Sequence, residues 1–127
     1  MFVEMTPSSG GSGSNIVYGT EPDKSTASEE FTINTGLSSI SRFIIWGLSG
    51  NGTSVIIYDK DAIGSNKFSS ANIQTGAVAQ KPNGTIGDNP GAYYSALKAL
   101  SGGNVTIKQA TNASNIFKTN IQWYAEA

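Results

Sequence analysis

Short apolar segments that alternate with period two recur along this chain, and most of them end at glycine, asparagine or serine. Such segments are typical of half-buried β-strands. Residues 40–48 and 54–58 form the clearest pair, because the turn between them at 49–52 contains an Asn-Gly dipeptide. We therefore predict an antiparallel hairpin here. Residues 43–46 are apolar at every position, so we expect this strand to be central and buried on both faces.

The same pattern predicts further strands on both sides of this hairpin. They lie at residues 31–34, 67–75, 105–108 and 116–124, and residues 16–18 are a short strand that can add to them. Residues 76–90 hold two prolines and several turn residues, which indicates a loop with at most one short edge strand.

Residues 88–103 allow two interpretations. Residues 88–90 read as a helix N-cap followed by proline, Tyr93, Leu97 and Leu100 have helical spacing, and the glycine pair at 102–103 would end the helix. We favour a short helix. The alternative is a strand that turns at the two glycines.

Together these segments predict an all-β protein, an antiparallel β-sandwich that is jelly-roll-like or immunoglobulin-like and has at most one short helix. A chain of 127 residues provides one domain. We expect a flexible N-terminal arm over residues 1–15, because residues 6–15 have the Ser/Gly composition of a linker, and a single sandwich domain over residues 16–127.

Composition excludes much chemistry. The chain has no cysteine and no histidine, so disulfides, thiol or imidazole catalysis and haem ligation are ruled out. Eight basic against nine acidic residues argue against nucleic-acid binding, and no apolar run approaches the ~20 residues of a membrane span. The acids cluster in the polar stretch at 20–30, where no rigid cleft is expected. We predict a protein that is not an enzyme, has no cofactor and does not bind a membrane.

One local cluster has the spacing of a cation site. Asp59, Asp61 and Asn66 would supply carboxylate and amide oxygens at the end of a strand. However, Lys60 lies between the acids, and the loop offers fewer oxygens than the six to eight that calcium takes. We therefore interpret it as a solvated turn.

Aromatic residues provide candidate ligand contacts, since sugars bind to aromatic faces beside amide groups. Tyr58, Tyr93 and Tyr94 are the candidates for a surface site that could contact a glycan, with rim or interface packing as the alternative. We assign Trp46 and Trp123 to the core instead, because each lies in an apolar run.

The first five residues form an apolar tag on the linker. Met1, Phe2, Val3 and Met5 could be a frayed terminus, or they could be a peg that docks on a neighbouring subunit in an assembly. We treat these four residues as a candidate interface.

The pattern of strands and turn residues also resembles that of a known group of proteins. The segments FTINTGL from Phe31, ISRFIIW from Ile40, GGNVTIK from Gly102 and IQWYA from Ile121 resemble small β-sandwich virion proteins of tailed bacteriophages, namely capsid decoration or auxiliary proteins and head-fibre or tail accessories. The resemblance covers residues 31–127. It implies that the protein has no catalytic activity and that its partners are other virion proteins. It also implies that the protein is made in the bacterial host cytoplasm and is present in many copies on each particle.

We therefore expect a non-enzymatic virion structural protein, a homo-oligomer that binds the particle through sheet edges and residues 1–5. The alternative is a sandwich that binds a carbohydrate or a host receptor through the loops at 59–66 and 76–90.

Overall fold

A computed structural model describes residues 15–127, which form two antiparallel sheets packed face to face. The predicted all-β sandwich is confirmed. Its elements are β1 (Ile16–Glu21), β2 (Glu30–Asn34), β3 (Arg42–Leu48), β4 (Thr53–Asp59), β5 (Lys67–Gln74), β6 (Ala77–Thr85), β7 (Ala96–Ser101), β8 (Asn104–Lys108), the 3-10 turn η1 (Ala113–Asn115) and β9 (Thr119–Glu126). Within these residues, no helix has the length and apolar character needed to cross a membrane.

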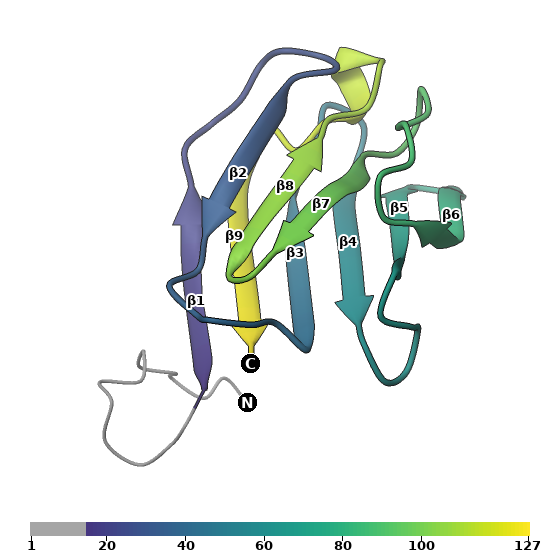
Figure 1. Cartoon of the computed structure of the whole chain (residues 1–127). Helices are drawn as coiled ribbons and strands as arrows, with labels where there is room; N and C mark the ends of the chain where they lie inside the picture. Colours follow the sequence, from purple (N-terminus) through teal and green to yellow (C-terminus); the bar gives the residue numbers. More distant parts are fainter. Residues whose placement is uncertain (1–14) are drawn as a thin grey trace.

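The two sheets differ in size. The larger sheet has the order β1-β9-β3-β4-β5-β6, and the smaller has the order β2-β8-β7. Figure 1 shows the smaller sheet in front, with β1 to one side of it and β5 and β6 to the other. The first two strands lie in different sheets, which is not the A-B-E-D and C-F-G arrangement of an immunoglobulin domain.

The predicted hairpin is confirmed as β3 and β4. Ile45 lies opposite Ile56, and the Ser49 N–H donates to the Gly52 carbonyl over 2.8 Å to close the turn. The Ser49 hydroxyl also accepts from the Gly52 N–H at 2.9 Å. β3 lies inside the six-stranded sheet between β9 and β4, as the apolar run predicted.

The predicted helix in residues 88–103 is wrong. Residues 96–101 form β7, which pairs with β8 and turns at the two glycines. A bulge between Leu97 and Ala99 shifts the register, and Leu97 is fully buried. Pairing with β8 satisfies a row of backbone groups and covers the core, which outweighs a local spacing of three apolar residues.

The stretch predicted as a loop with one short strand holds the nine-residue edge strand β6. Lys81 and Pro82 lie on it, and a bulge interrupts its pairing with β5. Lysine, proline and bulges all hinder the pairing of an edge strand with another chain. The β6 edge is therefore protected.

The core fills the space between the sheets. Trp123 belongs to it, as predicted, and its ring stacks on Phe43 with centroids 6.4 Å apart. The buried apolar residues are Ile33, Ile40, Phe43, Ile45, Ile56, Tyr58, Phe68, Ala96, Leu97, Val105, Ile107, Phe117, Ile121, Trp123 and Ala125. Both sheets contribute to this set, so one continuous core holds residues 31–127 together.

A buried amide fixes the segment that leads into β9. The Gln109 side chain donates to the Phe117 carbonyl and accepts from the Phe117 N–H, both at 2.9 Å. The Ser95 hydroxyl also lies within 3.3 Å of the Gln109 carbonyl oxygen and accepts from the Ala110 N–H. This pairing satisfies backbone groups that no strand reaches.

Candidate functional site

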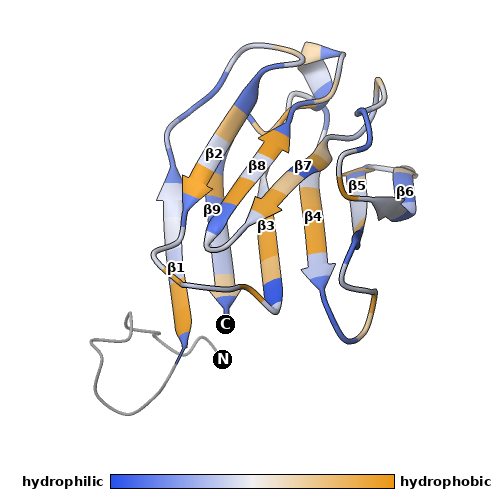
Figure 2. Cartoon of the chain, in the orientation of Figure 1, coloured by the Kyte–Doolittle hydropathy of each residue, from blue (hydrophilic) through white to orange (hydrophobic). Residues whose placement is uncertain are grey.

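The larger sheet has one side against the small sheet and one side that points away from it. We call the second side the outer face. Register and burial alternation place these apolar residues on it: Tyr18, Ile44, Trp46, Leu48, Val55, Ile57, Ala71, Ile73, Val78, Pro82 and Tyr124. The same face also carries the polar residues Thr20, Arg42, Thr53, Asp59, Lys67, Ser69, Gln80, Gln122 and Glu126. Its middle is apolar, and Figure 2 shows β3 and β4 coloured hydrophobic over most of their length.

Several of these side chains are well exposed. The exposed fractions are 37% for Ile57, 45% for Leu48, 48% for Ile73 and 56% for Val78. Ile73 lies opposite Val78 on the next strand, whereas Thr53 separates Leu48 from Ile73. Ile57 lies further along β4 and is linked to the others through the half-buried Val55 and Ala71. Soluble monomers rarely expose contiguous apolar areas beyond a few hundred Å², and such areas mark interaction sites.

The outer side of the small sheet provides a contrast within the same chain. Thr32, Asn34 and Asn104 point outwards there, and the Thr32 and Thr106 hydroxyls bond across the strands at 2.9 Å. That side has the polar surface expected of a sheet facing water. The apolar outer face of the larger sheet is therefore not a general property of this low-charge chain.

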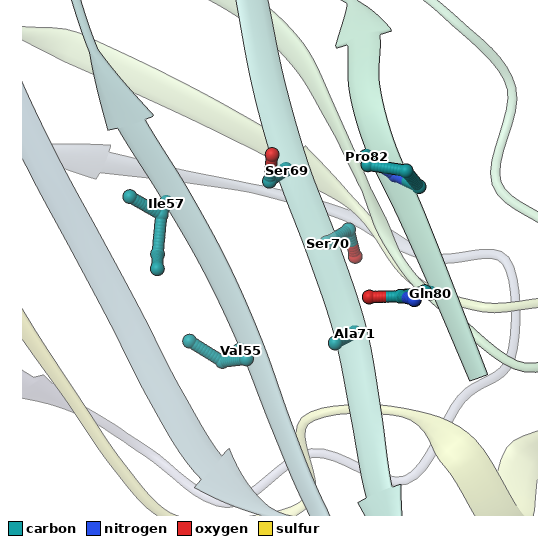
Figure 3. Close-up of a pocket in the computed structure, with 7 residues that line it drawn as sticks. All are labelled: Val55, Ile57, Ser69, Ser70, Ala71, Gln80 and Pro82. Atoms are coloured by element: carbon teal, nitrogen blue, oxygen red, sulfur yellow. The ribbon is translucent and has the colours of Figure 1, made fainter. Parts of the chain in front are cut away.

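An open hollow of about 210 Å³ lies on the outer face. Figure 3 shows the side chains around it on β4, β5 and β6, and its lining residues are Val55, Ile57, Ser69, Ser70, Ala71, Gln80 and Pro82. The lining is mostly aliphatic with a few hydroxyl and amide groups. Such a hollow suits one large apolar side chain.

A charged cluster borders the outer face at the ends of β3, β4 and β9. The Arg42 guanidinium donates to Asp59 over 3.0 Å and to Glu126 over 2.9 Å, and the Tyr124 hydroxyl donates to Glu126 over 2.7 Å. The Ala62 N–H and Arg42 both hold the pKa of Asp59 below its usual range. Burial, then the bond to Glu126, raises the pKa of Tyr124. The single positive charge of Arg42 is shared by the two carboxylates, so this cluster keeps one net negative charge.

Replacing Asp59 with asparagine should make stability less dependent on acid pH. Because the folded-state pKa of Asp59 is lowered, its contribution is present above the unfolded value of about 4 and is lost as the pH falls through the folded value. The wild-type protein should therefore be more stable than Asp59→Asn at pH 7, with the difference shrinking below about pH 4. Urea unfolding at pH 7, 4 and 2.5 measures this. Asp61→Asn is the control, and an Asp59→Asn difference that does not change with pH would contradict the assignment.

The aromatic candidates separate in the structure. Tyr58 is 2% exposed and its hydroxyl donates to the Ser65 carbonyl, so its prediction as a surface aromatic is wrong. It alternates with Ile57, and the alternation turns it into the core. Tyr93 is 57% exposed, and Tyr94 beside it is half-buried. Of the three candidate tyrosines, Tyr93 and Tyr94, in the loop before β7, are accessible.

The candidate cation cluster is a closed turn. The Asp59 carboxylate accepts from the Asp61 and Ala62 N–H groups at 3.0 and 2.9 Å and from Arg42 on its other oxygen. Asp61 and Asn66 are exposed. The part of the chain that the structure describes contains no group of three or more acidic, histidine or cysteine residues that could hold a metal ion.

Trp46 does not belong to the core, so that prediction is wrong. It lies on the outer face opposite Val55, half-buried among its neighbours. The sequence signal for this face was the apolar run at 43–46, which was interpreted as burial on both sides. Only one side is covered by residues 15–127. The candidate interface residues Met1, Phe2, Val3 and Met5 lie outside the described residues.

Comparison with known proteins adds no family to this geometry. No family model matches the chain, and neither a curated protein nor a solved structure is significantly similar to it.

Proposed function

We propose that this protein is a non-enzymatic structural protein of a phage virion, a capsid decoration or auxiliary protein or a head-fibre or tail accessory. It binds other virion proteins and copies of itself through the outer face. The observation that carries the proposal is the apolar middle of the outer face, together with the exposure of Leu48, Ile57, Ile73 and Val78 on that face. The virion setting rests on the resemblance of residues 31–127 to such proteins, as does localisation to the particle.

The chemistry of the outer face favours a protein partner. Its middle is apolar and includes Trp46, and burial of such side chains against other apolar groups is favourable. The charged groups lie at its border, where Arg42 already binds Asp59 and Glu126. An apolar centre with a polar rim is the usual anatomy of a protein interface.

The edge strand β6 also favours association through the outer face over strand pairing. The β6 edge is hindered by Lys81 and Pro82, so continuous strand pairing at this margin is disfavoured. We therefore leave the β6 margin out of the sheet edges that the sequence suggested, and assign binding to the outer face.

Replacing Ile57 with lysine tests this function. A charge in the middle of an apolar contact must be desolvated, so self-association of the full chain should weaken at least tenfold. Light scattering over a concentration series measures it. Thr32→Lys adds the same charge to the outer side of the small sheet and should leave the mass of the assembly in solution the same as that of the wild-type protein.

The alternative function is binding of a carbohydrate or host receptor, and the exposure of Tyr93 favours it. A monomeric wild-type chain that binds glycans on an array, with binding lost in Tyr93→Ala, would replace the virion proposal by this one. Equal self-association of Ile57→Lys and wild type would remove the outer face from the interface.

A further inference from the structure

We propose that residues 1–5 of one copy dock in the hollow on the outer face of a second copy, with Phe2 as the inserted side chain. This inference rests on the proposed function and names the occupant of its surface. It concerns a segment of the chain that precedes the described residues and a hollow that lies entirely within them.

The two surfaces match in chemistry. Val55, Ile57 and Ala71 line the hollow with aliphatic groups, and Phe2 is a large apolar side chain beside further apolar residues. Lys67 is exposed two residues before Ser69 on β5, and within residues 15–127 it makes no salt bridge. Glu4 is the only charged side chain among residues 1–5, and it carries the opposite sign. The segment therefore offers both the apolar anchor and the charge that this region accepts.

The place where the chain enters the structure sets how far residues 1–5 lie from the hollow. The described chain starts at Asn15, next to the edge strand β1, whereas the hollow lies on β4, β5 and β6 towards the opposite margin. Those strands are three to five spacings from β1, about 14–24 Å. Nine residues of Ser/Gly-rich composition, 6–14, span about 15–18 Å when relaxed, which lies within this range. A second copy is assigned as acceptor because the proposed function requires association between copies, and the mixing experiment below separates docking between copies from docking within one copy.

A second copy placed with its β6 margin beside the β1 margin of the first brings its hollow close to the start of the first copy's linker. Donor and acceptor surfaces then lie on opposite margins of the same sheet. Such a contact is heterologous, and repetition of it generates a ring or an open array. Either arrangement suits a protein present in many copies on a particle.

Two full-length variants test the inference separately and as a mixture. Phe2→Asp removes the anchor and keeps the hollow, while Ile57→Lys removes the hollow and keeps the anchor. Each alone should self-associate at least tenfold more weakly than wild type in sedimentation velocity. The equimolar mixture should form a complex of two chains, because the intact arm of Ile57→Lys meets the intact hollow of Phe2→Asp. Ser9→Asp places the same charge in the linker as a control and should behave as wild type.

The outcomes separate the inference from the proposed function. If Phe2→Asp associates as wild type while Ile57→Lys does not, another occupant uses the outer face and only this inference fails. If both variants are monomeric and their mixture is too, arm docking between copies is excluded. If Ile57→Lys associates as wild type, the interface role of the outer face fails as well. If circular dichroism shows that Ile57→Lys does not fold, Ala71→Glu replaces it as the variant with an altered hollow. The same outcomes then apply to Ala71→Glu.

Discussion

Replacing Gln109 with leucine should lower the free energy of unfolding by about 4 kcal/mol. Gln109 is fully buried, and its amide satisfies both the N–H and the carbonyl of Phe117. Leucine has similar bulk but leaves these two backbone groups buried without partners, and each unsatisfied group costs about 1–3 kcal/mol. The Ser95 hydroxyl loses a bond as well.

Urea unfolding followed by tryptophan fluorescence measures this effect. Asn104→Leu is the control, since Asn104 is exposed on the outer side of the small sheet and its substitution should change stability by no more than about 0.5 kcal/mol. A loss under about 1 kcal/mol for Gln109→Leu would show that the amide does not hold the entry to β9.

Replacing Gly103 with alanine should cost about 3 kcal/mol or more. A Cβ at this position would overlap the Leu37 carbonyl oxygen and lie 2.8 Å from the carbonyl carbon. Because these atoms belong to the backbone, relief requires a shift of the segment itself. The Gly103 carbonyl also accepts from the Thr35 N–H and hydroxyl, so the same shift strains those bonds.

Gly76→Ala is the control for this prediction. Gly76 has a positive φ of 76°, but an added Cβ would meet no atom within 4 Å. Its substitution should therefore cost only the conformational penalty of about 1–2 kcal/mol. Thermal unfolding of both variants compares the two, and equal losses would contradict the close approach of Leu37 to the turn.

Neither Gln109 nor Gly103 belongs to the outer face. Variants at these two positions therefore lower stability without touching the proposed interface, whereas Ile57→Lys changes the interface at an exposed position. Measuring both properties on all three proteins distinguishes a loss of folding from a loss of assembly.

Local sequence was sufficient to predict secondary structure where the signals lie within a few residues of one another. The hairpin of β3 and β4 followed from alternation and an Asn-Gly turn, both of which act within a few residues. The segment at 96–101 did not follow, because the spacing of three between Leu97 and Leu100 fits a helix, and it fits a strand only with the bulge between Leu97 and Ala99. The choice depends on β8, which offers a hydrogen-bonding edge and buried Val105 and Ile107. That partner is supplied by tertiary pairing.

The candidate site divides in the same way. The sequence alone determined an all-β sandwich, the central place of β3 and the exclusion of cysteine and histidine chemistry, because period, turn residues and composition are properties of the chain itself. Only the tertiary structure decided that Tyr58 is buried and that Trp46 lies outside the core. An apolar residue on a strand prefers to leave water whichever way it points, and its direction depends on which side of the sheet another sheet covers. The small sheet covers one side of the larger sheet, so the apolar side chains on the other side remain available for a partner.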